Sequence, residues 1–400
     1  MIALHVIDDS FLQPEPGTSA GDHLVSGLVP LALLGPAAAT YPRLRAGARA
    51  VVALLSGAFG IATGAEAWIY TREVGASGDD FTGLLAIPAG LGLIGLAAVT
   101  LWRSRRLDES RPRRYVRRAL IALAGAIVAV NLVLPVLLSY GFTHIGRAVV
   151  PEPDLGAAHR DVTFATSDGL TLEGWYVPSR NRAAVIAFPG RKGPRRQTRM
   201  LARHGYGVLL FDRRGEGDSE GEPNALGWDG EKDLRAALAF LRRQPDVDPR
   251  RIGGIGLSVG GELLLQAAAH TDELRAVVSE GAGIRSVREQ QETDGARRWL
   301  ELPTWAMTTL ATTVFANRGP PPNLKDLVGR ISPRPVFLIY AERGQGGEDL
   351  NPEYFAAAGP PRTIWKTDSG HTGGIEAEPR EYERRVPAFF DRYLLGRRGP

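Results

Sequence analysis

The chain has 400 residues, of which 44% are hydrophobic and 23% are charged, and it contains no cysteine. This composition excludes disulfide-stapled scaffolds, thiolate zinc sites and cysteine nucleophiles, together with collagen-like and wholly disordered chains. The net charge of +4 is small, and no basic patch with interleaved aromatic residues points to a nucleic-acid partner. The length is typical of two or three domains, and the mean hydropathy of −0.11 averages two unlike halves.

Four apolar stretches follow one another in the first 142 residues, at about 24–40, 50–70, 81–102 and 119–140. A helix of roughly 20 apolar residues is long enough to cross the bilayer core. The last three stretches reach that length, whereas the first is shorter and contains Pro30 and Pro36. Trp68 and Trp102 lie at stretch ends, where amphipathic rings favour the headgroup region. The sequence therefore predicts an all-α transmembrane domain of about four helices over residues 1–142, with the lipid bilayer as its partner.

Arginine is concentrated in the loop over residues 103–118, which carries eight arginines against Asp108 and Glu109. Short basic loops stay on the cytoplasmic side of a membrane. The last helix therefore leads outward, and residues beyond about 142 are expected on the extracytoplasmic side of a multi-pass cell-membrane protein.

The remainder of the chain alternates short apolar runs with helical patterns. After a polar linker at 143–160, the Asp168–Gly169 turn between alternating residues indicates a β-hairpin. This alternation predicts an α/β domain with a mostly parallel sheet over residues 161–398. Ligands bind such sheets at the carboxyl ends of the strands, so we expect the chemistry there. The runs typical of buried strands lie at 183–188, 207–211, 252–257, 275–279, 335–340 and 363–367.

Three serines lie in G-x-S-x-G patterns: Ser19, Ser219 and Ser258. In a nucleophile elbow this pattern forms a tight turn from a strand into a helix. Ser19 has no strand before it, and Ser219 follows a loop and precedes Pro223. Ser258 alone follows an apolar strand pattern and precedes a helical one, so it is the candidate nucleophile.

A serine hydroxyl needs an adjacent base to become a good nucleophile. His371 lies in a glycine-flanked loop just past the last predicted strand, whereas the other histidines precede the domain or lie at helix ends. The acid that orients the imidazole is expected between the 335–340 strand and His371. Glu348 is favoured because a glycine-rich loop returns the chain there, and Asp349 and Glu342 remain alternatives.

An acyl-transfer site also needs two preorganised N–H donors for the oxyanion. The amide of Val259 follows the candidate nucleophile at the start of a helical pattern. The second donor is expected from the loop after the 183–188 strand, where Arg191 is the candidate.

On these residues the chain resembles the α/β-hydrolase superfamily over about residues 160–398. The likeness includes the elbow, the Gly-His-Thr-Gly-Gly loop at 370–374, and the run FDRRGEGDS at 211–219, which is similar to the superfamily's D-x-R-G-x-G-x-S loop. The resemblance implies a serine hydrolase in which Asp212 and Arg214 are structural. The chain departs from the pattern at Pro189, where His is common, and in the acid loop, where G-x-x-D is met only at Gly346 and Asp349.

The segment 283–330 interrupts the strand–helix alternation. An insertion after the 275–279 strand lies over the carboxyl edge of the sheet. We expect either a cap that lines an apolar pocket, with Trp299, Trp305 and Met307, or ordinary amphipathic helices packed on the sheet.

The sequence thus predicts a membrane-anchored serine hydrolase that cleaves an ester-type bond in a small-molecule or lipid acyl substrate. A peptidase or an acyltransferase would use the same groups. A membrane scaffold or sensor with a non-catalytic hydrolase-like domain is the alternative from another class. No nucleotide-binding or metal-ligand pattern fits the second half of the chain, so no cofactor and no metal is expected.

Overall fold

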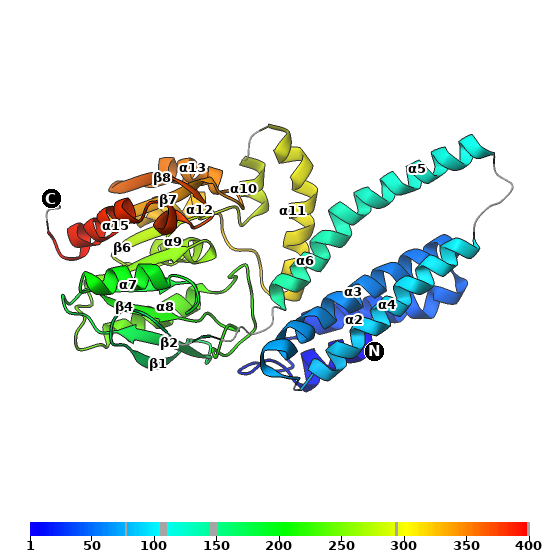
Figure 1. The fold of residues 1–400 in the computed structure, drawn as a ribbon, viewed down its shortest axis with the longest axis horizontal. Helices are drawn as coiled ribbons and strands as arrows, with labels where there is room; N and C mark the ends of the chain where they lie inside the picture. Colours follow the sequence, from blue (N-terminus) through cyan, green and yellow to red (C-terminus); the bar gives the residue numbers. More distant parts are fainter. Residues whose placement is uncertain (77, 105–109, 145–149, 152, 293–294, 398–400) are drawn as a thin grey trace. The chain divides into compact units, whose positions relative to one another are not determined.

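A computed structural model describes the chain except residues 77, 105–109, 145–149, 152, 293–294 and 398–400 (Figure 1). The chain divides into two compact units. The first comprises Met1–Gly146, Glu222–Asn224 and Asp294–Gly319, and the second comprises Arg147–Gly221, Ala225–Thr293 and Pro320–Pro400. Residues 145–149 and 152 of the predicted linker lie outside the described part, so the linker stays a prediction.

The first unit is helical. Among its described residues, four segments are long and apolar enough to cross a membrane: Leu24–Arg43, Ala46–Ile69, Asp80–Arg103 and Arg111–Thr143. These segments confirm the predicted all-α domain before the sheet. The helices are α1 (Ile2–Ile7), α2 (Leu24–Thr40), α3 (Ala46–Val74), α4 (Asp80–Arg103), α5 (Arg111–Val128) and α6 (Leu134–Thr143), with π-helical turns at Asp8–Leu12 and Ala129–Val133 and a 3-10 turn at Tyr41–Arg43.

The helices extend beyond the apolar stretches that predicted them. The stretch expected at 119–140 belongs to a helical segment that begins at Arg111. Arginine is a good helix former, so the helix continues through a run that is too polar for the bilayer core. Hydropathy therefore locates the span, whereas helix propensity decides where the helix starts.

Glycines allow α3 and α4 to pack closely. A Cβ on Gly57 would lie 2.6 Å from the carbonyl oxygen of Gly90, and a Cβ on Gly90 would lie 2.6 Å from that of Gly57. About two turns further along α3, a Cβ on Gly64 would lie 2.6 Å from the carbonyl oxygen of Gly83. Close backbone contact at small residues is the usual way in which helices associate in lipid.

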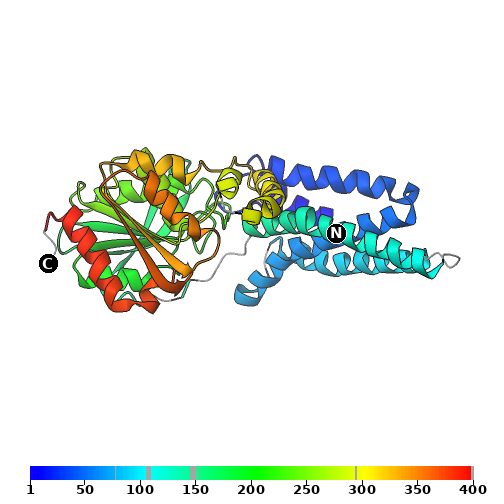
Figure 2. The same cartoon turned by 90° about the horizontal axis from the view of Figure 1, so that it is seen from above.

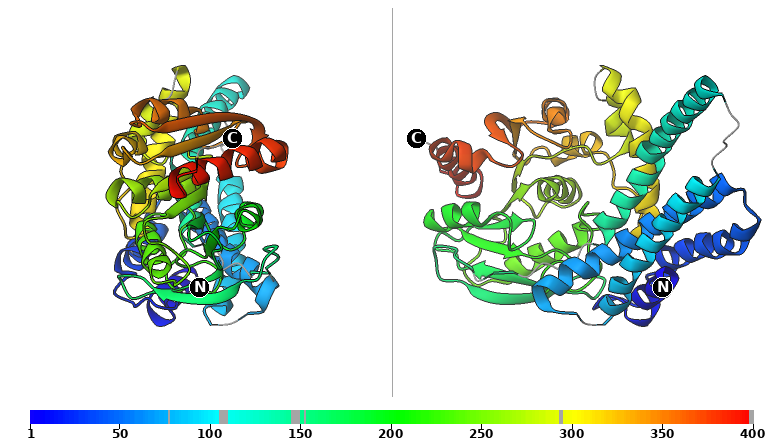
Figure 3. Two further views of the ribbon diagram at one scale, coloured as in Figure 1. Left: turned by 90° about the vertical axis from the view of Figure 1, so that its left-hand side faces the viewer. Right: turned by 45° about the vertical axis from the view of Figure 1, so that its right-hand side comes forward.

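Helix α11 (Gly295–Phe315) belongs to the first unit, although the chain reaches it from the second (Figures 1 and 3). It packs against α6, where the hydroxyl of Ser139 donates to the carbonyl of Thr308 at 3.1 Å. The rings of Tyr140 and Phe315 meet edge to face, with centroids 5.3 Å apart. The segment 283–330 was expected to cap or cover the sheet. Its longest helix, α11, instead belongs to the first unit, together with the N-terminal helices.

The described residues of the second unit form an eight-stranded sheet in the order β1-β2-β4-β3-β5-β6-β7-β8. The pairs β1–β2 and β2–β4 are antiparallel, and the remaining pairs are parallel. The predicted α/β class and mostly parallel sheet are confirmed. The strands are β1 (Arg160–Ala165), β2 (Thr171–Val177), β3 (Ala184–Phe188), β4 (Gly207–Phe211), β5 (Ile252–Leu257), β6 (Ala276–Glu280), β7 (Val336–Arg343) and β8 (Arg362–Gly370).

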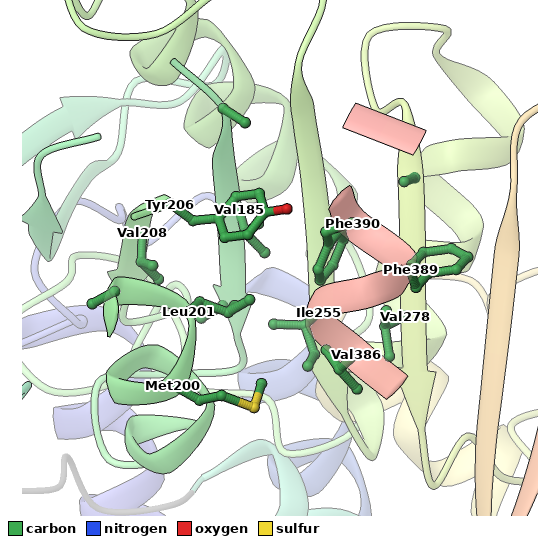
Figure 4. Packing of buried hydrophobic residues seen from close by; sticks show 14 of the residues in the cluster. Val185, Met200, Leu201, Tyr206, Val208, Ile255, Val278, Val386, Phe389 and Phe390 are labelled. Carbon is green, nitrogen blue, oxygen red and sulfur yellow. The ribbon is translucent and has the colours of Figure 1, made fainter. Parts of the chain in front are cut away.

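Helices cover both faces of this sheet. On one face, α7 (Arg195–Arg203) and α15 (Pro379–Leu394) contribute Met200, Phe389 and Phe390 to a core shared with Val185 and Ile255 of the strands (Figures 2 and 4). On the other face lie α8 (Glu231–Arg242) and α9 (Val259–His270). The remaining helices are α10 (Val287–Glu292), α12 (Leu324–Val328), α13 (Asn351–Ala357) and α14 (Gly374–Ala377), with 3-10 turns at Gly329–Ile331 and Glu348–Leu350.

Alternation along the strands explains these two layers. Successive side chains of a strand point to opposite faces, so Ile255 faces α7 and α15 while its neighbour Gly254 faces α9. A Cβ on Gly254 would lie 2.7 Å from a methyl carbon of Leu264 in α9, so the helix lies directly on the strand.

Candidate active site

The turn between β5 and α9 holds Ser258 in a strained backbone conformation. Its φ is +51° and its ψ is −126°, a region that residues other than glycine occupy only when the surroundings impose it. The amide of Ser258 donates to the carbonyl of Glu280 at 2.8 Å, which ties the turn to the end of β6. The hydroxyl therefore projects from the carboxyl edge of the sheet, where the G-x-S-x-G pattern placed it.

The glycines on either side of Ser258 make this turn possible. A Cβ on Gly256 would lie 2.4 Å from the carbonyl carbon of Gly260, across the turn itself. A Cβ on Gly260 would lie 2.5 Å from Pro189 Cδ, at the end of β3. Because Cβ atoms do not approach other atoms so closely, both positions require glycine.

His371 joins Ser258 to Glu348. Its Nε2 lies 2.9 Å from Ser258 Oγ, and its Nδ1 is hydrogen-bonded to Glu348 Oε1. With a proton on Nδ1, the ring donates to the carboxylate and accepts from the hydroxyl through Nε2. The structure thus brings together three predicted residues that lie up to 113 positions apart in the chain.

Glu348 is held rigidly beneath the imidazole. Its side chain is 2% exposed, and its Oε2 accepts a hydrogen bond from the amide of Ala341 at 2.8 Å. The residue before it, Gly347, has a φ of +90°, and a Cβ there would lie 2.2 Å from Ile284 Cγ1. The glycine-rich extension is therefore what lets the chain turn back beneath His371.

Asp349 and Glu342 were the alternatives to Glu348 as the acid that orients His371. Asp349 is exposed, and the hydrogen bond to His371 comes from its neighbour Glu348. The side chain of Glu342 lies outside the described part of the structure.

The hydrogen bond that His371 donates to Glu348 raises the pKa of His371 above its ordinary value of 6.5, and the charge of that carboxylate adds to the effect. Partial burial of the ring opposes the shift, because desolvation disfavours the charged imidazolium. The carboxylate therefore favours the protonated ring, which is the state that a general base reaches when it takes a proton from serine.

One of the two expected oxyanion donors is corrected by the structure. The amide of Arg191 donates to Asp212 Oδ1 at 2.6 Å, so it is not free to bind an oxyanion. The side chain of Arg191 is also engaged, with Nε 2.6 Å from Asp212 Oδ2. Sequence reasoning could not foresee that a buried carboxylate takes this amide.

Within the described residues, no protein acceptor is recorded for the amides of Val259, Gly190 or Lys192. Val259 occupies the first position of α9, where backbone N–H groups point out of the helix. The amide predicted at Val259 is thus open, and Gly190 and Lys192 of the turn after β3 also carry open amides.

The loop after β4 carries structural ion pairs, as the resemblance implied. Arg214 binds Asp233, which is fully buried, through Nε at 2.9 Å and Nη2 at 2.7 Å. The hydroxyl of Ser219 donates to the carbonyl of Asp212 at 2.9 Å and accepts from the amide of Glu173 at 2.9 Å. The second G-x-S-x-G serine therefore holds a loop to β2, and its hydroxyl proton is already donated to a carbonyl.

The pocket residues expected on the inserted segment lie on α11. Trp299 is 70% exposed, whereas Trp305 and Met307 are half-buried. Because α11 belongs to the first unit and Ser258 to the second, a substrate-binding role for these three residues stays a prediction.

Sequence reasoning did not single out Glu280, the last residue of β6. Its side chain is 2% exposed and reaches the loop that carries His371. The available signal was an acidic residue directly after a continuous apolar strand pattern, at the edge of the sheet where the chemistry was expected.

Comparisons with known proteins agree with this geometry. Residues 135–333, just under half of the chain, match the family described as X-Pro dipeptidyl-peptidase (S15 family). An uncharacterized protein of Mycobacterium tuberculosis is 42% identical over 118 residues, which cover 28% of this chain and 41% of that protein. The polyketide transferase grgF of a Penicillium species is 35% identical over 127 residues, covering 30% of this chain and 43% of that protein. The chain thus spans about two fifths of the length of these curated relatives.

Among solved structures, the esterase Pf2001 of Pyrococcus furiosus aligns with a TM-score of 0.50 at 25% identity. The alignment covers 62% of this chain and 97% of the esterase. The sheet order, the strained serine between β5 and α9, and these likenesses together show that the second unit has the α/β-hydrolase fold.

Proposed function

We propose that this chain is a membrane-anchored serine hydrolase that cleaves an ester-type acyl bond through Ser258, His371 and Glu348. The observation that carries the proposal is the continuous hydrogen-bonded series from Ser258 Oγ through the imidazole to Glu348. A buried carboxyl group behind an imidazole that contacts a strained serine has the geometry of an activated nucleophile.

In the proposed reaction, Ser258 Oγ attacks the carbonyl carbon of the substrate while His371 Nε2 takes the hydroxyl proton. Glu348 stabilises the resulting imidazolium, and the amide of Val259 with one amide of the turn after β3 binds the oxyanion. The tetrahedral intermediate collapses when His371 returns the proton to the leaving alcohol. Water then attacks the acyl-enzyme while His371 Nε2 takes a proton from it. The second tetrahedral intermediate collapses to the acid as His371 returns that proton to Ser258 Oγ.

The choice of an ester over a peptide bond is part of the proposal. The alignment over nearly the whole of the Pyrococcus esterase supports ester hydrolysis. The match to the S15 peptidase family supports a second candidate, cleavage of a peptide bond by the same three groups. Both reactions pass through an acyl-enzyme, so the site geometry serves either one.

Anchoring rests on the four helical segments that are long and apolar enough to cross a bilayer. The arginine-rich segment at 103–118 favours a cytoplasmic position for that end of the helices. We infer from this that the helix that ends at Thr143 leads outward and that the hydrolase unit is extracytoplasmic, where a small ester or a lipid acyl group is the proposed substrate.

A fluorophosphonate probe on membranes that contain the full chain tests the nucleophile. We expect the probe to label the chain and Ser258→Ala to abolish labelling. Ser19→Ala, which removes an exposed serine in the same G-x-S-x-G pattern, is the matched control and should label like the parent chain. An intact parent chain that takes up no probe would favour the non-catalytic scaffold.

A substrate panel on the full chain in detergent separates the two reactions. It should include p-nitrophenyl esters of several chain lengths and X-Pro p-nitroanilides. Higher kcat/KM on the esters supports the proposal, and higher kcat/KM on the anilides favours the peptidase. For topology, protease added to intact cells should digest the hydrolase unit, whereas full protection would contradict the extracytoplasmic assignment.

A further inference from the structure

Glu280 connects the two halves of the candidate active site. Its main-chain carbonyl accepts the amide of Ser258 at 2.8 Å. Its side-chain Oε1 accepts the amide of Gly374, three residues after His371, at 2.8 Å. Its Oε2 accepts the hydroxyl of Tyr382 at 2.6 Å. One residue at the end of β6 therefore fixes both the turn that carries the nucleophile and the loop that carries the base.

The residue after Glu280 lies directly against the imidazole. A Cβ on Gly281 would lie 3.3 Å from His371 Cε1 and 3.4 Å from His371 Nδ1. A Cβ on Gly374 would lie 2.8 Å from Glu280 Oε1, so the loop and the carboxylate are in van der Waals contact as well. The end of β6 thus forms the support on which the His371 loop rests.

Among the described residues, no lysine or arginine forms an ion pair with Glu280, and its charged neighbours include the carboxylates of Glu376 on α14 and Glu348 on the 3-10 turn. Two titratable groups favour the charged form of Glu280. Tyr382 on α15 donates a hydrogen bond to the carboxylate, and His371 becomes positive when it is protonated. A buried carboxylate without a cation is costly, so a purely structural role would be served better by a neutral side chain.

Resting on the proposed function, we propose that Glu280 is a positioning residue for His371, which holds the loop of the base at a fixed separation from Ser258 and stabilises the imidazolium with its charge. The two parts of this role depend on different properties of the side chain. The hydrogen bonds to Gly374 and Tyr382 set the position, and the negative charge acts on the protonated ring through space.

Burial raises the pKa of Glu280 from 4.5 to about 7, and the hydrogen bonds from Tyr382 and Gly374 limit the rise. The carboxylate is therefore ionised above about pH 7, the range in which a neutral His371 can act as a base. The charge of Glu280 also contributes to the raised pKa of His371.

The test compares three substitutions in the full chain, measured as the rate of fluorophosphonate labelling and as kcat/KM on an ester from pH 5 to 9. Glu280→Gln retains groups that accept from Gly374 and pair with Tyr382, but it removes the charge. The midpoint at which kcat/KM rises on the acidic side reports the deprotonation of His371, and in Glu280→Gln it should therefore move to lower pH. Glu280→Ala also releases the loop and should slow labelling by about 10²-fold, the cost of misplacing a reacting group by about 1 Å.

Glu289→Gln is the matched control. Glu289 is also a buried carboxylate, and its two oxygens accept the amides of Arg285 and Leu324. Arg285 and Leu324 take no part in the hydrogen bonds that join Ser258, His371 and Glu348. This variant should keep the pH midpoint and the labelling rate of the parent chain even if its thermal stability falls.

An unshifted midpoint in Glu280→Gln would overturn the charge role, and labelling of Glu280→Ala at the parent rate would overturn the positioning role. If Glu280→Ala does not fold, Tyr382→Phe replaces it in the test, because it removes one of the two hydrogen bonds to the Glu280 side chain. This variant should lose less labelling than expected for Glu280→Ala, at an unchanged pH midpoint. Labelling of Tyr382→Phe at the parent rate would refute the positioning role of that hydrogen bond. A parent chain that takes up no probe refutes the proposed function instead, so the two failures are distinguishable.

Discussion

The most quantitative prediction concerns the stability of the hydrolase unit as the pH changes. In the folded state the pKa of Glu280 is about 7, against 4.5 for a solvated glutamate. One pKa unit corresponds to 1.36 kcal/mol of differential interaction, so this difference of about 2.5 units amounts to about 3 kcal/mol. Glu280→Gln does not titrate and should remove this dependence.

The sign follows from the protonation states. Below about pH 4.5 Glu280 is protonated in both the folded and the unfolded chain, and its contribution to stability is fully present. As the pH rises towards 7, the unfolded state releases the proton and the folded state retains it, so stability falls. Relative to Glu280→Gln, the parent chain should therefore lose about 3 kcal/mol of unfolding free energy between pH 4.5 and pH 8.

Hydrogen exchange of the buried amides of β5 and β6 measures this difference in the full chain in detergent. The two proteins are compared at the same pH, so the intrinsic exchange rate cancels. The ratio of their protection factors should change by about 10²-fold between pH 5 and pH 8. A ratio that does not depend on pH would mean that the carboxylate is not desolvated as the contacts with Gly374 and Tyr382 indicate, and the reasoning from burial would fail.

Three further predictions concern the site itself. Glu348→Gln keeps the shape of the acid but not its charge, and should lower kcat by on the order of 10³-fold, whereas Asp349→Asn should leave kcat within about twofold. Because Glu348 raises the pKa of His371 and the base must be neutral, kcat/KM should rise with pH through a midpoint above 6.5, and a midpoint below that value would contradict the hydrogen bond. Gly260→Ala places a Cβ 2.5 Å from Pro189 Cδ and should destabilise the hydrolase unit by about 1–3 kcal/mol, as judged by denaturant unfolding of the full chain. A Gly260→Ala chain of unchanged stability would show that the turn can relax away from β3.

The site illustrates how a fold keeps a reactive group at the expense of stability. Ser258 has a positive φ, and Glu280 is a carboxylate in an apolar layer with no partner cation among the described residues. Both features cost free energy and persist because the surrounding sheet and helices impose them. They lie within one hydrogen bond of each other, at the carboxyl ends of β5 and β6.

The local parts of the site could be predicted from the sequence. An apolar strand, a tight glycine-rich turn and a helix are encoded within a dozen residues, so Ser258 was recognisable as a nucleophile candidate. His371 was recognisable because a flexible loop follows the last predicted strand. Glu348 could only be favoured over Asp349 and Glu342, because the choice depends on how a glycine-rich extension turns back.

Contacts between distant segments that no catalytic role connects could not be predicted. The amide of Arg191 is taken by Asp212, which lies 21 residues away and binds it only because β3 and β4 are neighbours in the sheet. Likewise, nothing in the sequence pairs Glu280 with Gly374, which is 94 residues away. Hydrogen-bond partners depend on distances of a few tenths of an ångström, and those distances exist only once the strands are ordered.

The sequence by itself determined the fold class and the polarity of the two halves, because periodicity and hydropathy are local properties that each segment carries with it. It also determined the number of apolar segments long enough for a bilayer. Only the tertiary structure decided which acid faces the imidazole, which amides remain open to an oxyanion, and that the segment between β6 and β7 contributes a helix to the first unit. Those outcomes depend on burial and on the competition for hydrogen-bond partners between residues that meet only in the folded chain.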